Sequence, residues 1–233
     1  AWTLTSCEKD TGTETVNVTI GFSNNVTTAT RAGDINNDNL TSIGVFASLT
    51  HGNFDATVST PNFMYNQLVE KKNGTWQYSP LKYWPNNDSD KISFFAYAPH
   101  NATGVTPSNA IQKGYPSFTY TTPTAEADQV DLLAATPIIN QNGGSVDFKM
   151  QHALTKVVFN VKSNDDITGK VITAFSITGA KSGTLAFHVP ANDDDKGFGW
   201  TYPSTVTAET FTATTKSLSV PDKSTPEEAM LCT

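Results

Sequence analysis

The feature that most limits the fold of this chain is a two-residue alternation of apolar side chains in short segments. The clearest example lies at residues 15–22, where every second residue is apolar. These apolar residues are Val16, Val18, Ile20 and Phe22. In an extended strand they share one face, so the segment is predicted to be a strand with one buried side. No segment before residue 140 keeps a 3.6-residue period, and we therefore expect an all-β fold.

Length and composition support this fold class and suggest two domains. The chain has 233 residues, which is room for two β-sandwich domains of ordinary size. It holds 35 threonines, and this β-branched polar residue suits the solvent face of a sheet. The most loop-like stretch in the middle of the chain is 140–145. We predict an N-terminal sandwich at 15–140 and a C-terminal sandwich at 145–233, the second incomplete at its C-terminal end.

Charge and cysteine content exclude several classes of partner. The net charge is −7, and the 15 Lys and Arg residues form no basic run, so no nucleic-acid partner is predicted. The two cysteines, Cys7 and Cys232, lie near opposite ends and fit neither a disulfide framework nor a zinc site. No stretch reaches the roughly 18 apolar residues that a membrane-spanning helix needs. Any membrane attachment therefore has to use another device.

The N-terminal residues supply a candidate for that device. The tetrapeptide at residues 4–7, Leu-Thr-Ser-Cys, resembles the lipobox of a bacterial lipoprotein signal peptide. In such lipoproteins the cysteine carries the lipid, which points to Cys7. Residues 1–6 would then be a signal-peptide remnant, and the polar residues 7–14 a lipid-anchored linker. A di- or triacylated cysteine gives stable attachment, because each buried methylene contributes about 0.8 kcal/mol.

Four segments in the same order also resemble a known family. The matching stretches are 76–85, with the sequence WQYSPLKYWP, 92–99 (ISFFAYAP), 131–135 (DLLAA), and 146–148 (VDF) with 152–159 (HALTKVVF). Together they are similar to the fimbrillins of Bacteroides-type bacteria, the subunits and accessory proteins of type V pili, including the Mfa-like branch. The resemblance implies two transthyretin-like β-sandwich domains in tandem, export as a lipoprotein, and assembly by exchange of strands between subunits.

The resemblance also assigns a role to the first strand. In the family, a trypsin-like protease cuts after a basic residue in the loop that follows this strand, and a strand from another subunit fills the groove that is left. The loop here contains Arg31, the only arginine of the chain, among Thr, Asn and Gly residues. Arg31 is therefore the expected processing site. Val16, Val18, Ile20 and Phe22 would form the displaced strand, because such exchange uses alternating apolar side chains.

No group of residues in the sequence predicts an enzyme, a metal site or a cofactor. The four histidines are far apart, and His152 is expected to pack at the start of a strand. The segment 34–39 begins like a calcium loop, but its sixth position is Asn39 and its twelfth is Val45. The aspartates at 193–195 are expected to be solvated in a turn. No serine stands in a nucleophile motif.

A cluster of aromatic residues leaves one alternative function open. Trp76, Tyr78, Tyr83 and Trp84 could stack on sugars, although aromatic residues of a sandwich more often pack in the core. The predicted function is a structural or adhesive pilus subunit at the cell surface, held in the outer membrane or in a fimbrium. Its predicted partners are other pilin subunits, with host surface proteins or glycans as further candidates. The alternative is a monomeric surface lipoprotein that binds glycans.

Overall fold

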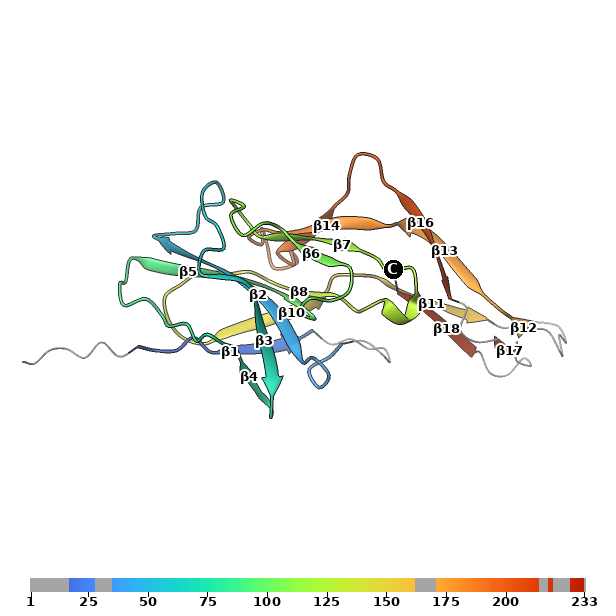
Figure 1. Cartoon of the computed structure of the whole chain (residues 1–233), viewed down its shortest axis with the longest axis horizontal. Coiled ribbons are helices and arrows are strands. Elements are labelled where there is room, and N and C mark those ends of the chain that lie inside the picture. The colour runs from blue at the N-terminus through green and yellow to red at the C-terminus, as the bar shows by residue number, and fades with distance from the viewer. Residues whose placement is uncertain (1–16, 28–34, 162–170, 214–217, 220–226, 233) are drawn as a thin grey trace, which may run out of the picture.

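The computed structural model describes residues 17–27, 35–161, 171–213, 218–219 and 227–232, and these residues form an all-β protein (Figure 1). The only helix among them is a single 3₁₀ turn, η1, at Glu126–Asp128. Most strands gather in a two-layered body, and the remaining ones extend away from it as paired strands. This confirms the predicted all-β class. No helix in the described part of the chain is long and apolar enough to cross a membrane.

The larger layer of the body is an eight-stranded sheet. Its order is β1-β10-β8-β5-β2-β3-β4, and β9 also pairs with β5. The strands are β1 (Phe22–Val26), β2 (Ser42–His51), β3 (Met64–Lys72), β4 (Thr75–Gln77), β5 (Asp90–Ala98), β8 (Leu133–Ala135), β9 (Ile138–Gln141) and β10 (Val146–His152). All pairs in this sheet are antiparallel except β1 with β10, which run parallel. β1 is therefore an edge strand with an exceptional pairing.

The turn between β3 and β4 follows from two residues. Asn73 and Gly74 have φ angles of 52° and 78°, and both lie in the left-handed region. A two-residue hairpin turn of type I′ requires positive φ at both of its central positions, which Asn-Gly tolerates best. The register continues directly from this turn, with Lys72 opposite Thr75. In the sequence, an Asn-Gly dipeptide between the runs 63–71 and 75–79 predicts such a hairpin, and the structure confirms it.

The smaller layer is a four-stranded sheet that covers one face of the larger one. Its order is β15-β14-β7-β6. These strands are β6 (Val105–Pro107), β7 (Ser117–Thr121), β14 (Ser182–Phe187) and β15 (Phe198–Thr201). Buried side chains from both layers, such as Phe95 of β5 and Phe187 of β14, form one apolar core. The two layers are therefore a β-sandwich.

The sheets do not divide at the predicted domain boundary of 140–145. Strand β10, which follows this stretch, pairs with β8 before it, and β14 pairs with β7. Residues 146–152 and 182–201 therefore belong to the same sandwich as the strands that precede residue 140. The loop-like sequence at 140–145 marks a turn between neighbouring strands, because its Asn and Gly residues suit a chain reversal as well as a linker.

The opposite face of the large sheet carries a second apolar core. Here Ile43, Val45, Phe94 and Phe148 are buried together with Trp84. The sheet curls so that the chain before β1 meets the chain after β4, where the Ile20 N–H donates to the Lys82 carbonyl at 2.9 Å and the Trp84 N–H donates to the Val18 carbonyl at 2.9 Å. Strand β5 is consequently buried on both faces.

The remaining strands form three two-stranded ladders. β11 (Lys156–Val161) pairs with β18 (Glu227–Cys232), β12 (Val171–Ile172) with β17 (Leu218–Ser219), and β13 (Phe175–Ala180) with β16 (Ala208–Ala213). Figure 1 shows them reaching away from the sandwich as a long extension. Along β13 the residues alternate between exposed and half-buried. Neither side of β13 therefore carries a fully buried residue.

Candidate functional site

The candidate site is the edge of the large sheet where β1 lies along β10. Their register is parallel, with Phe22 opposite Val146, Asn24 opposite Phe148 and Val26 opposite Met150. The three β10 residues in these pairs are buried. Backbone pairing continues beyond the strand ends, since the Val146 N–H donates to the Gly21 carbonyl and the Thr27 N–H to the Met150 carbonyl. In the described structure β10 is the only strand that pairs with β1.

The buried face of this segment keeps the predicted even-numbered positions Ile20 and Phe22 but lies further along the chain than predicted. The sequence predicts a strand at residues 15–22, whereas the observed strand begins at Phe22 and extends into the stretch predicted to be a polar loop. Val18 is 56% exposed, and the apolar contacts come from Ile20, Phe22 and Val26, which are buried. The shift arises from tertiary pairing, because β10 offers buried partners to Phe22 and Val26 while Ser23 and Asn25 face outward.

Phe22 is the main apolar anchor of β1. Its ring stacks on Phe148 of β10 with the centroids 5.8 Å apart and the planes at 8°. It also meets Tyr78 and Phe94 edge to face, at 5.2 and 5.9 Å. Offset or edge-to-face aromatic pairs contribute roughly 0.5–1.5 kcal/mol beyond the burial of their area. Removal of β1 would therefore uncover an aromatic pocket in the core.

Tyr78 connects the residues before β1 to the chain after β4. Its hydroxyl donates to the Ile20 carbonyl at 2.9 Å and lies 3.2 Å from the Lys82 N–H. Burial of the phenol raises the pKa of Tyr78 above its ordinary value, so the hydroxyl keeps its proton at physiological pH. Most of the aromatic residues that could stack on sugars therefore pack in the core. Trp84 is buried and Trp76 and Tyr78 pack against the same cluster, whereas Tyr83 is exposed.

The outward side of β1 makes only polar contacts. The Ser23 hydroxyl donates to Asp147 Oδ1 on β10, and the Ser145 hydroxyl donates to the same oxygen at 2.9 Å. Both hydrogen bonds lower the pKa of Asp147 below 3.8, and the bond from Ser23 has the larger effect. At the free edge, the Val26 N–H donates to Asn37 Oδ1 at 2.7 Å. Asn37 Nδ2 also donates to Asn25 Oδ1 at 3.3 Å, so two bonds of one side chain meet this edge where a neighbouring strand would supply a ladder of backbone bonds.

The chain that follows the predicted processing loop is anchored separately. Asp131 Oδ2 accepts a hydrogen bond from the Ile35 N–H at 2.7 Å, and its Oδ1 lies 2.8 Å from His152 Nδ1. Both side chains are largely buried, at 16% and 27% exposure. His152 lies at the end of β10 rather than at the start of a strand. Because Asp131 and His152 lie in the body of the sandwich, Ile35 is held independently of β1.

Three predicted site residues fall outside the described part of the chain. They are the candidate lipidation site Cys7, the first apolar residue of the predicted strand, Val16, and the candidate processing site Arg31. The described residues on either side of Arg31 are Thr27, which continues the pairing of β1, and Ile35, which Asp131 holds. No grouping of His, Cys, Asp and Glu suited to a metal ion occurs among the described residues.

The acidic turn at 193–195 holds a loop together. Asp195 accepts hydrogen bonds from the Ala191 N–H and the Gly197 N–H, both at 2.9 Å, and contacts His188 Nε2 at 2.8 Å. These hydrogen bonds lower the pKa of Asp195 to about 2. A carboxylate with such a pKa stays ionised and is a poor general acid, so the geometry indicates a loop cap.

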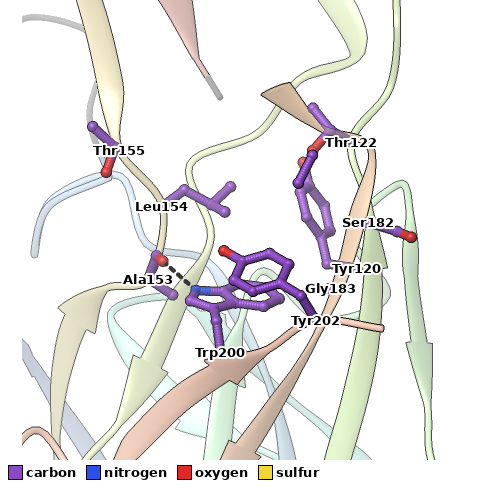
Figure 2. A pocket seen from close by; sticks show the side chains of 10 residues that line it. Tyr120, Thr122, Ala153, Leu154, Thr155, Ser182, Gly183, Trp200 and Tyr202 are labelled. Carbon is purple, nitrogen blue, oxygen red and sulfur yellow. Dashed lines mark hydrogen bonds between the residues drawn. The ribbon is translucent and has the colours of Figure 1, made fainter. Parts of the chain in front are cut away.

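A shallow pocket lies where the sandwich meets the extension (Figure 2). Its wall is formed by the rings of Tyr120, Trp200 and Tyr202 together with Leu154. The Trp200 indole N–H donates to the Ala153 carbonyl at 2.7 Å, and Tyr202 is 54% exposed. These residues come from segments that are distant in sequence, so no local sequence pattern marks them.

Together, the sandwich and its parallel edge strand define an all-β protein whose candidate site is the edge strand β1. A family model for fimbrillin-like proteins matches residues 27–231. The chain belongs to this fimbrillin-like family, which confirms the resemblance seen in its strand segments. The family consists of fimbrial structural subunits and is not an enzyme family.

Among curated proteins, the chain is similar to the fimbrium subunit Fim1C of Phocaeicola vulgatus, with 32% identity over 203 residues. The match covers 77% of this chain and 53% of that protein, so the chain spans about half the length of this relative. Among solved structures, a fimbrial protein from Bacteroides vulgatus superposes with a TM-score of 0.68 and 24% identity, covering 93% of this chain and 76% of the other. A candidate cell adhesion protein from Bacteroides uniformis gives 0.51 and 15%, covering 92% and 75%. These two structures share the fold.

Proposed function

We propose that the protein is a fimbrial subunit that joins other pilin subunits by exchanging β1 for a strand of a neighbour. The observation that carries this proposal is the position of β1: it is a five-residue edge strand, its pairing is parallel, and its apolar side chains fill a groove lined by β10. A strand added to a sheet edge gains backbone hydrogen bonds, and alternating side chains in pockets give it specificity. Parallel pairing is slightly weaker per residue than antiparallel pairing, which favours replacement.

Proteolysis at Arg31 would make this exchange possible. Arg31 lies between β1 and Ile35, which is bonded to Asp131 in the body of the sandwich. A cut in this interval separates β1 covalently from the rest of the chain while the rest stays attached at Ile35. After the cut, the segment that contains β1 is held by its pairing with β10, by the side-chain contacts of Phe22 and Val26, and by hydrogen bonds of the Val18 and Ile20 backbone. None of these contacts is covalent, so the strand can leave without a second cleavage.

The location and the domain division are part of the same proposal. Lipidation at Cys7 and a linker at 7–14 would tether the subunit to the outer membrane before assembly. The described sandwich would be one transthyretin-like domain. The ladders of β11 with β18, β12 with β17 and β13 with β16 would belong to a second one. The second domain would then begin after β10. Strands β14 and β15 follow later in the chain but pair within the first sandwich.

An arginine-specific protease tests the proposal cleanly, because the chain has a single arginine. We expect one cut, loss of the N-terminal fragment and the appearance of oligomers that resist SDS. The Arg31→Ala variant is the matched control and should remain uncut and monomeric. A chain that is cut at Arg31 yet stays monomeric under the same conditions would contradict strand exchange.

The pocket of Figure 2 supports a second candidate function, glycan binding by a monomer. Its rings Trp200 and Tyr202 come from one strand region, and Tyr202 is exposed enough to stack on a sugar. Titration with oligosaccharides of glucose, galactose and mannose should then change the tryptophan fluorescence, and Tyr202→Ala should abolish the change. Tyr83→Ala, at an exposed tyrosine outside this pocket, is the control. Equal responses of both variants would reject the pocket.

A further inference from the structure

One residue of β1 does not match the groove that it fills. Asn24 lies between Phe22 and Val26 on the strand and is paired with Phe148 of β10, so it shares the inward face with these apolar residues. Both polar atoms of its side chain, Oδ1 and Nδ2, are buried. Within the described structure neither atom has a hydrogen-bond partner. An edge strand thus places an unpaired amide against the core.

The surroundings explain why this amide finds no partner. The β10 residues opposite the inward face of β1 are Val146, Phe148 and Met150, which offer no polar side-chain groups for such a bond. The backbone groups of the ladder are already engaged between the strands. A buried polar group without a partner loses its hydration and gains nothing in return, so its replacement by an apolar group of similar size stabilises the pairing.

We propose that the strand which replaces β1 carries an apolar, branched side chain at the position of Asn24, so that this position makes the exchange favourable. The inference rests on the proposed function and deepens it by describing the partner: a segment of a second pilin subunit with apolar residues at all three inward positions. An aromatic residue fits the Phe22 position, an aliphatic one the Asn24 position, and valine or a similar residue the Val26 position. β1 then binds the groove less tightly at its central position than the strand that replaces it.

A competition between peptides tests the inference. Peptides of residues 17–27 are prepared with the native sequence, with Asn24→Val and with Asn25→Val, and each competes with a labelled native peptide for the chain cut at Arg31. Asn25 faces outward on the same strand, where its Oδ1 accepts a long, exposed hydrogen bond from Asn37 Nδ2 at 3.3 Å. Asn25→Val therefore has the same gain in β-propensity without filling the groove and removes only this weak bond. We expect the Asn24→Val peptide to bind about tenfold more tightly than the native one, and the Asn25→Val peptide to stay within about twofold.

The uncut full chain supplies an independent measurement. Asn24→Val should raise the midpoint of thermal unfolding, and Asn25→Val should leave it nearly unchanged. Equal affinities of the three peptides, or an Asn24→Val chain no more stable than the Asn25→Val chain, would overturn the inference. If no peptide enters the cut chain, strand exchange itself fails, and the stability of the two uncut variants still decides the role of Asn24.

Discussion

Strands β1 and β5 belong to the same sheet but are held in opposite ways. β5 has nine residues, strand neighbours on both edges and buried side chains on both faces. β1 has five residues, one strand neighbour, and an outward face with the half-buried Ser23 and the exposed Asn25. Both contribute aromatic rings to the same core, where Phe22 meets Phe94. The difference therefore lies in how each strand is paired and covered.

This contrast shows where a β-sandwich can tolerate replacement of a strand. Removing β5 would leave unpaired backbone groups on its three neighbours, β2, β8 and β9, and open both cores, whereas removing β1 opens one groove along β10. In a native protein, the regions that unfold locally are its least stable ones. The sandwich thus separates a fixed frame from an exchangeable edge, and each prediction below changes one side of that comparison.

The largest effect is expected for Phe94→Ala on β5. Phe94 is fully buried and meets both Phe22 and Trp84. Its truncation removes apolar contacts and leaves a cavity, which costs about 3–5 kcal/mol. Denaturant unfolding measures this loss as a lower midpoint for the whole domain. A loss below about 1 kcal/mol would show that β5 is not the fixed centre of the sheet.

Phe22→Ala on β1 should have a smaller and more local effect. The loss of three ring contacts weakens the strand by roughly 3 kcal/mol, the low end of the range for phenylalanine, because Phe22 lies at an edge. Hydrogen exchange should show faster exchange of the β1 amides while those of β5 remain protected. Equal deprotection of both strands would mean that β1 cannot open alone.

How much of this could be predicted from the sequence depends on whether a feature is local. The hairpin at Asn73-Gly74 is specified by two adjacent residues, and the sequence predicts it correctly. The position of β1 is not local, because Phe22 and Val26 are selected by their partners on β10, more than 120 residues away. The buried amide of Asn24 is invisible for the same reason: in the sequence it looks like part of a polar loop, and only the register with Phe148 turns it inward.

Asp131→Ala tests the anchor on the other side of the processing loop. The substitution leaves the Ile35 N–H and the His152 ring without their shared acceptor, which should cost about 1–3 kcal/mol. Thermal unfolding measures the loss, and hydrogen exchange should locate it at Ile35 and not in β1. Asp128→Ala is the control, since Asp128 is exposed in η1. If the two variants are equally stable, the chain after the loop is held by other contacts.

The smallest effect is expected from acid, through the bond between Ser23 of β1 and Asp147 of β10. This bond lowers the pKa of Asp147 from 3.8 in the folded state. Its contribution to the stability of the β1 pairing is therefore complete above pH 3.8 and is lost as the pH falls through the lowered pKa. The group is exposed, so the contribution is less than about 1 kcal/mol. Protection of the β1 amides, corrected for intrinsic rates, should therefore fall slightly as the pH drops below 3.8.

The Ser23→Ala variant separates this bond from a general effect of acid. Removing the hydroxyl deletes the larger of the two hydrogen bonds that lower the pKa, so the acid-dependent loss of protection should shrink, while the Ser145 bond keeps part of it. Above pH 5 the variant should already show the weaker β1 that the native chain shows only in acid. An unchanged pH profile in Ser23→Ala would place the acid sensitivity elsewhere. The frame strand β5 is the comparison for this profile, because the ion pair that it makes among the described residues, between Asp90 and His51, lies at its first residue and away from the core.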